Sequence, residues 1–249
     1  MIELINVSKT FDNGIEKNHA FKTTDLVIEK GQFVSVVGGN GAGKSTFLSL
    51  ISGVNKPTTG QILIDGIDVT KMPRHKRATY IASVFQDPNM GVSPELTIAE
   101  NMAIAYARGT GRHGLSIALK KKHLDIFAEK LATFGRGLED RLHQKVNLLS
   151  GGQRQVVTLM MATLHKPKLL LLDEHTSALD PPISKQVMEV TNEIVTTLGI
   201  TTIMITHSLS DAIFYGDRLL MFRQGEKAFD LIGAEKSKMT VSDLVTKFE

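Results

Sequence analysis

Residues 38–46 decide the fold, and they read GGNGAGKST. A short apolar, β-branched stretch precedes them at 32–37 and predicts a buried strand. A mostly apolar stretch follows at 46–52 and stops at Gly53, which predicts a helix. Glycines between a strand and a helix, closed by a lysine and a serine, match the phosphate-binding P-loop pattern. A glycine-rich turn that binds nothing would leave this flanking strand and helix unexplained.

The residue types of this loop predict what it binds. Glycines let backbone N–H groups approach phosphate oxygens, and the helix N-terminus adds partial positive charge. Lys44 supplies a full charge toward the β- and γ-phosphates, and Ser45 offers a hydroxyl ligand to Mg²⁺. We therefore expect a nucleotide phosphate to bind here, at Gly38, Gly39, Asn40, Gly41, Ala42, Gly43, Lys44, Ser45 and Thr46.

Composition places the chain among ordinary α/β proteins. Of 249 residues, 42% are hydrophobic and 22% charged, which predicts a normal core. The formal net charge of +3 is too small to indicate nucleic acid as a partner. There is no cysteine, so no disulfide or thiolate metal site is expected. Without a membrane-spanning apolar run or a signal-peptide core, we expect a cytosolic chain that reaches a membrane only by docking to another protein.

Polar side chains follow three further predicted strands. Gln86 follows the strand at 79–85, Asp173 and Glu174 follow the wholly apolar strand at 169–172, and His207 follows the strand at 202–206. In open parallel sheets, ligands bind at the carboxyl ends of the strands. We therefore expect these side chains to converge on the phosphates that the P-loop holds.

Each of these side chains suits one task in phosphoryl transfer to water, which needs positioning and charge neutralisation. Asp173 would orient Mg²⁺, usually through water, and Glu174 would polarise the attacking water. His207 would hydrogen-bond the γ-phosphate and hold that water. Gln86 would reach Mg²⁺ or the water. Taken alone, His207 would more often be an ordinary histidine without a catalytic role.

Three other features each allow two interpretations. Phe11 could be a satellite core residue or an aromatic platform for an adenine ring, and its spacing favours the core. The basic cluster Arg74–Arg77 favours a solvated face over a ligand site. His175, beside the carboxylates, could be a metal ligand, but no second histidine stands at ligand spacing, so we reject that role.

The middle of the chain changes from strands to helices. Thr97 and Glu100 form the sequence pattern of a capping box, and so do Ser150 and Gln153. We expect an α-helical subdomain at about 93–165, inserted in a core made of residues 1–92 and 166–249.

The segment Leu149-Ser150-Gly151-Gly152-Gln153 completes a pattern that resembles the ATP-binding cassette family. The order also matches, with the P-loop, Gln86, this segment, the strand that ends at Glu174, Ser177–Asp180 and then His207. The resemblance covers essentially the whole chain. It implies one domain, a P-loop NTPase (RecA-like) α/β core with an antiparallel β portion and an inserted α-helical subdomain.

The resemblance also implies ligands and partners. ATP and Mg²⁺ would bind between two copies of the chain in a head-to-tail dimer, because the LSGGQ segment of one subunit faces the P-loop of the other. The ATP site would then include Ser150, Gly151, Gly152, Gln153 and Asp180. Phe11 would stack on adenine, against the preference from its spacing alone. The loop Gln86–Gly91 and the helical subdomain would dock a transmembrane permease.

Several classes share this pattern. A cassette ATPase of a transporter is favoured, and a separate ATPase chain resembles bacterial importers most, with a split exporter as the alternative. Soluble translation-associated relatives resemble two fused cassettes, and chromosome ATPases need a long coiled-coil insertion that this chain lacks. A P-loop small-molecule kinase would not explain LSGGQ or the segment at 177–180.

An importer implies further expectations. The chain would lie at the cytoplasmic face of the membrane, held by the permease, and an extracytoplasmic substrate-binding protein would belong to the system. The stretch from Phe85 to Met102, with His175, resembles an importer subgroup linked to amino-acid substrates. The departures from the family are few: Phe11 stands where many relatives have tyrosine, and His175 where many have proline.

Overall fold

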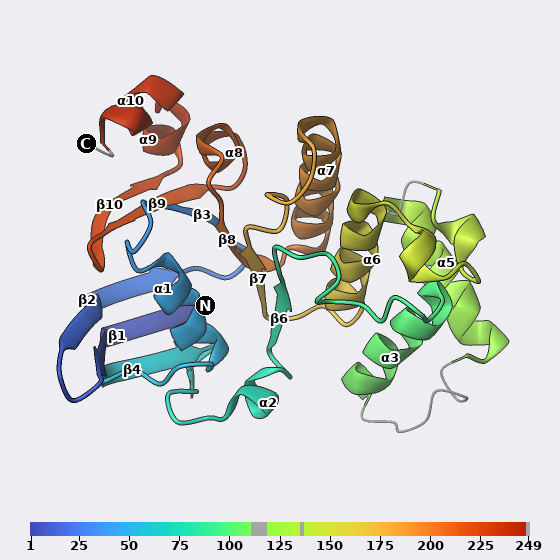
Figure 1. Cartoon of the computed structure of the whole chain (residues 1–249), viewed down its shortest axis with the longest axis horizontal. Helices are drawn as coiled ribbons and strands as arrows, with labels where there is room; N and C mark the ends of the chain where they lie inside the picture. Colours follow the sequence, from blue (N-terminus) through green and yellow to red (C-terminus); the bar gives the residue numbers. More distant parts are fainter. Residues whose placement is uncertain (111–118, 135–136, 248–249) are drawn as a thin grey trace. The chain divides into compact units, whose positions relative to one another are not determined.

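The computed structural model describes residues 1–110, 119–134 and 137–247 (Figure 1). The chain forms two compact units. The first contains Met1–Ile81, Lys168–Glu174 and Gly199–Glu249, and the second contains Ala82–Pro167 and His175–Leu198. The division into a core and a helical subdomain at about 93–165 stays a prediction, and the two units are described separately.

A mainly parallel sheet carries the P-loop in the first unit. β3 (Phe33–Val37) pairs in parallel with β8 (Thr201–Ile205) and β9 (Arg218–Arg223), β8 pairs in parallel with β7 (Leu169–Asp173), and β9 pairs antiparallel with β10 (Glu226–Ile232). The order of the strands of the first unit is β10-β9-β3-β8-β7. β6 (Ile81–Val84) begins at Ile81, where the chain passes from the first unit into the second. The two apolar runs predicted as buried strands are confirmed, because β3 is buried along its whole length and β7 at its first four residues.

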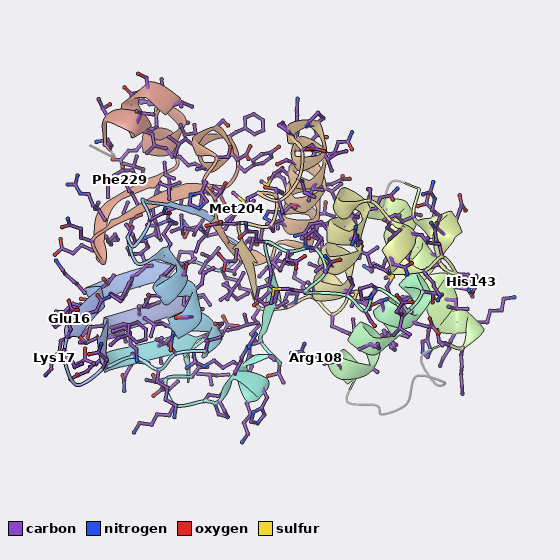
Figure 2. The ribbon with its side chains drawn as sticks, in the orientation of Figure 1. Glu16, Lys17, Arg108, His143, Met204 and Phe229 are labelled. Atoms are coloured by element: carbon purple, nitrogen blue, oxygen red, sulfur yellow. The ribbon has the colours of Figure 1, made fainter. Side chains whose placement is uncertain are left out.

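The first unit also contains an antiparallel sheet. Its order is β2 (Lys17–Ile28), β1 (Ile2–Asp12), β4 (Thr59–Ile64) and β5 (Ile67–Asp68). Glu16 and Lys17 mark the turn between β1 and β2 (Figure 2). Both strands are longer than the expected 2–7 and 21–28, since bulges let the pair continue through polar, exposed residues that carry no hydrophobic signal.

Helices cover the P-loop strand from both faces of the parallel sheet. The helices of this unit are α1 (Lys44–Ser52), α2 (Arg74–Arg77), α8 (Leu209–Phe214), α9 (Ala234–Ser237) and α10 (Val241–Thr246). Val34 and Val36 of β3 join α1 and the antiparallel sheet in one core cluster, whereas Val37 joins Ala212 of α8 and Leu244 of α10 in another. The alternation along β3 therefore fixes the strand between two apolar layers.

Three phenylalanines lock α1 in place. The rings of Phe21 on β2, Phe47 on α1 and Phe222 on β9 contact one another, with centroids 5.9, 5.5 and 5.1 Å apart. All three side chains are buried. Tilted and offset aromatic pairs of this kind stabilise a core beyond the area they bury. The helix that follows the P-loop is therefore anchored to a strand of each sheet.

The prediction that the basic cluster at 74–77 is solvated is wrong for its last residue, Arg77. Arg74, His75 and Lys76 are exposed, but Arg77 is completely buried. Its Nη1 donates to the carbonyls of Leu50 (2.6 Å) and Ile51 (2.8 Å), and the rest of the guanidinium donates to carbonyls of the segment that precedes α2. The buried cation thus caps the C-terminal end of α1, where the helix dipole is negative.

The second unit is mainly helical. It contains α3 (Ile98–Thr110), α5 (Lys121–Phe134), α6 (Gly151–Thr163) and α7 (Pro181–Leu198), with 3₁₀ turns η1 (Glu139–Arg141) and η2 (Val146–Leu148). Both predicted capping boxes are confirmed: Thr97 and Glu100 bond reciprocally before α3, and Ser150 and Gln153 do so at α6. Within the described ranges, no helix has both the length and the apolarity required to cross a bilayer.

Candidate active site

The P-loop backbone needs its glycines because other backbone comes too close for side chains. A Cβ on Gly38 would lie 2.4 Å from the carbonyl oxygen of Phe222, and one on Gly43 would lie 2.9 Å from that of Ala20. Gly43 also has a φ of 103°, which favours glycine. The Gly225 N–H donates to Ala42 O at 3.0 Å and holds the loop against the β9–β10 turn. The sequence pattern therefore reflects close packing as well as phosphate chemistry.

Gly38→Ala should lower the free energy of unfolding by about 2 kcal/mol or more, because carbonyl backbone cannot move aside at low cost. Gly39→Ala is the matched control, since no atom lies within 4 Å of a Cβ at that position. Urea unfolding followed by circular dichroism measures both. Equal stability of the two variants would contradict the packing argument.

Lys44 begins α1 with its side chain buried against the loop that precedes it. Its Nζ donates to the carbonyl oxygens of Gly38 (2.7 Å) and Gly39 (3.0 Å). Burial lowers the pKa of Lys44, while the carboxylates of Glu174 and Asp173 act in the opposite direction. Ser45 lies exposed in the first turn of the same helix. The loop therefore presents a restrained cation and a hydroxyl side by side in the chain.

Asp173 is the last residue of β7, and its environment connects it to the P-loop lysine. Burial and the neighbouring Glu174 raise the pKa of Asp173, whereas Lys44 acts to lower it. Lys44 and Asp173 thus influence each other's protonation, and the charge of Glu174 acts on both. The predicted convergence of the P-loop and the strand that ends in two carboxylates is present in the first unit.

The side chain of Glu174 contacts that of His207, which follows β8. The Nε2 atom of His207 lies 2.7 Å from Oε1 of Glu174. The Glu174 backbone N–H donates to Ile205 O at 3.0 Å, so the residue stays attached to β8 beyond the end of β7. Its φ is 50°, in the left-handed region. We refer to Lys44, Asp173, Glu174 and His207 as the strand-end cluster.

The donor set near the P-loop fits Mg²⁺. Ser45 and Asp173 offer a hydroxyl and a carboxylate, and hard divalent cations prefer such oxygen ligands. Among the described residues, no group of three or more histidine, cysteine, aspartate or glutamate side chains could hold a metal ion by itself. Mg²⁺ commonly binds through one or two carboxylates together with substrate phosphates, so this sparse set agrees with a metal that arrives with a nucleotide.

Other predicted site residues belong to the second unit. Gln86 is exposed two residues after the end of β6, and Ser150 is exposed at the N-terminus of α6. Gly152 allows close helix packing, because a Cβ there would lie 2.3 Å from Ile183 Cγ2. Asp180 is exposed, and its carbonyl accepts from Ser184 N at the start of α7. Their roles toward ATP or Mg²⁺ stay predictions.

Phe11 is not a core residue, so the interpretation from its spacing alone is wrong. It lies in β1 with 40% of its surface exposed. The Lys9 ammonium lies 4.8 Å from its ring centroid. The exposed ring agrees with a stacking platform, and the adenine contact stays a prediction.

Two connections in the second unit were not expected from the sequence. His175 is buried, with Nε2 3.1 Å from Thr191 Oγ1, and burial lowers its pKa to about 3, so its ring is neutral. Arg154 Nη1 donates to Asn89 Oδ1 at 2.5 Å. The two bonds join residues 16 and 65 positions apart, so no local pattern in the sequence indicates them.

Sequence comparison identifies the family. The model of the ABC transporter family matches residues 21–177. A tyrosine transport ATP-binding protein of Clostridioides difficile (strain R20291) is 43% identical over 250 residues, which cover 100% of this chain and 99% of that protein. The spermidine/putrescine import ATP-binding protein PotA of Spiroplasma citri is 35% identical over 90% of this chain, which spans only 59% of that longer protein.

Solved structures give the same result. The dimeric post-hydrolysis state of the ATP-binding cassette MJ0796 bound to ADP and Pi is 31% identical, with a TM-score of 0.77 over 93% of this chain and 98% of that one. The ADP conformation of the cassette MJ1267 is 26% identical, with a TM-score of 0.80 over 100% of this chain and 98% of that one. These likenesses confirm the predicted P-loop NTPase fold. The chain belongs to the ABC transporter family, as one of its ATP-hydrolysing, ATP-binding subunits.

Proposed function

We propose that this ATPase powers a bacterial importer of tyrosine or a chemically similar aromatic amino acid. The full-length likeness to the tyrosine transport protein carries this proposal, since the match leaves almost none of either chain uncovered. Other relatives are named as import proteins for spermidine and putrescine or for methionine, which supports import over a split exporter. The substrate itself would contact the permease and an extracytoplasmic substrate-binding protein.

The strand-end cluster performs the hydrolysis in this proposal. The P-loop N–H groups and Lys44 bind the phosphates and neutralise their charge. Glu174 accepts a proton from the attacking water, whose oxygen forms the new bond to the γ-phosphorus as the bond to ADP breaks. His207, 2.7 Å from Glu174, orients that carboxylate and the water. Mg²⁺, held by Ser45, Asp173 and Gln86, would neutralise phosphate charge.

A second copy of the chain would complete each ATP site. Ser150 is exposed at the N-terminus of α6, a helix of 13 residues, where N–H groups and the helix dipole favour an anion. Gly151 and Gly152 keep this helix end narrow and pack against the segment around α7. MJ0796 was solved as a dimer bound to ADP and Pi, which supports the same assembly here. Phe11 and Asp180 would contact the nucleotide in the closed pair.

The loop Gln86–Gly91 would pass motion to the permease at the cytoplasmic face of the membrane. Met90 at its tip is 66% exposed. Arg154 ties the loop to α6 through Asn89, and Gln155 donates to Phe85 O at 3.0 Å. A displacement of this loop would therefore also move the helix that begins at Ser150.

Reconstitution tests the proposed function. The chain would be purified with a bacterial permease and substrate-binding protein that assemble with it, and the complex placed in vesicles loaded with ATP and Mg²⁺. We expect accumulation of added tyrosine that stops when ATP is replaced by ADP. ATP-driven transport of tyrosine out of the vesicles would support the exporter. ATP hydrolysis that does not depend on tyrosine, without any tyrosine transport, would contradict the proposed substrate class.

Met90→Asp should separate coupling from nucleotide binding. A charge at the exposed loop tip would disrupt an apolar dock, so we expect at least about a tenfold loss of uptake with ATP affinity within about twofold of the original. Val54→Asp is the control, because Val54 is a comparable exposed apolar residue (56%) in the first unit. Equal loss of ATP binding and uptake in Met90→Asp would refute the docking role.

A further inference from the structure

The backbone of Glu174 adopts an unusual conformation that its surroundings must maintain. Its φ of 50° lies in the left-handed region, which few non-glycine residues adopt. Such residues persist only where neighbouring contacts over-determine them, and they concentrate at functional sites. On its N-terminal side, Glu174 continues β7 and bonds to Ile205 O at 3.0 Å. A second restraint, on the C-terminal side of Glu174, would hold its backbone in this conformation from both directions.

His175 follows Glu174 on this side, and its ring is held in place. It is 1% exposed, and its Nε2 lies 3.1 Å from Thr191 Oγ1 on α7. The single hydroxyl proton of Thr191 is given to the Val187 carbonyl at 2.7 Å. Thr191 Oγ1 must therefore accept, which makes Nε2–H of His175 the donor.

We propose that His175 is a positioning residue, which holds the backbone of Glu174 in its left-handed conformation through the hydrogen-bond relay from His175 through Thr191 to Val187. This inference rests on the proposed role of Glu174 as the group that polarises water. The relay spans from the residue after Glu174 to the second and third turns of an 18-residue helix.

The histidine fits this task because of its shape. A planar, buried ring offers its N–H donor in one fixed direction. A leucine could fill the same space without the donor. A glutamine could place an amide N–H near the position of Nε2.

The relay is tested from the Thr191 side, where the change is nearly isosteric. Thr191→Val removes the acceptor, and we expect kcat for ATP hydrolysis to fall about tenfold with KM for ATP unchanged. Thr191→Ser keeps the hydroxyl and should retain most of kcat. Thr196→Val is the control on the same helix, because the exposed Thr196 hydroxyl makes the same kind of bond, to Asn192 O at 2.7 Å.

The His175 side provides the second arm. His175→Leu should reproduce the loss of kcat, and His175→Gln should restore a substantial part of it. If Thr191→Val keeps full kcat, or if it loses ATP affinity and stability as strongly as kcat, the positioning role is wrong. Glu174→Gln, measured alongside, separates the two proposals: a fully active Glu174→Gln would refute the role of Glu174 itself, whereas an inactive one with an active Thr191→Val would refute only the relay.

Discussion

Glu174→Gln should reduce the rate of ATP hydrolysis by about 10²- to 10⁴-fold, the usual contribution of a positioned general base. The amide cannot accept a proton from water at neutral pH, although it has almost the shape of the carboxylate. ATP affinity should remain, because the P-loop and Lys44 are unchanged. Phosphate release in single-turnover experiments measures the rate, and fluorescent-nucleotide titration measures the affinity.

Glu193→Gln is the matched control for this change. Glu193 is an exposed residue on α7, so its substitution removes one negative charge without touching the strand-end cluster. Its turnover should match that of the original chain. Turnover of Glu174→Gln within about fivefold of this control would assign the base to another residue.

Arg77→Met should lower the free energy of unfolding by about 3 kcal/mol or more. The substitution keeps an apolar side chain in the space but removes the donors to four buried or partly buried carbonyls, two of them at the C-terminal end of α1. Each buried acceptor left without a partner costs its desolvation free energy. Because α1 carries Lys44 at its other end, the loss should also weaken ATP binding.

Arg74→Met provides the control, since Arg74 belongs to the same short helix and is exposed. It should change the free energy of unfolding by less than about 0.5 kcal/mol, as surface substitutions usually do. Equilibrium unfolding in urea compares the two variants. A similar small effect for both would mean that water satisfies the α1 carbonyls when the guanidinium is gone.

The sequence allowed the fold to be predicted where local pattern and tertiary environment agree. The strand before the P-loop is apolar except for Ser35 because it is buried along its whole length, and the helix after it is bounded by glycines at each end. The capping boxes at Thr97 and Ser150 depend only on residues three positions apart, so they could be identified directly. Strand-end polar residues could be placed together because parallel topology aligns those ends.

Features that depend on distant contacts could not be predicted. Arg77 differs from its basic neighbours only because α1 ends beside it, and no pattern within 74–77 shows that. Phe11 is exposed because β1 continues past its apolar half through bulges. The bond from His175 to Thr191 joins residues 16 apart in the chain, and neither has a helical or strand signal that links them. β10 was not predicted either. Nearly half of its residues are polar, and like the polar end of β1 they carry no hydrophobic signal.

The central claim is that each ATP site is half built in one chain and completed by a second copy. The most direct measurement is the molar mass of the Glu174→Gln variant by light scattering, with ATP and Mg²⁺ or with ADP and Mg²⁺. We expect twice the mass of the single chain with ATP and the single-chain mass with ADP, because slow hydrolysis preserves the bridging γ-phosphate. A single-chain mass at saturating ATP would contradict the shared site.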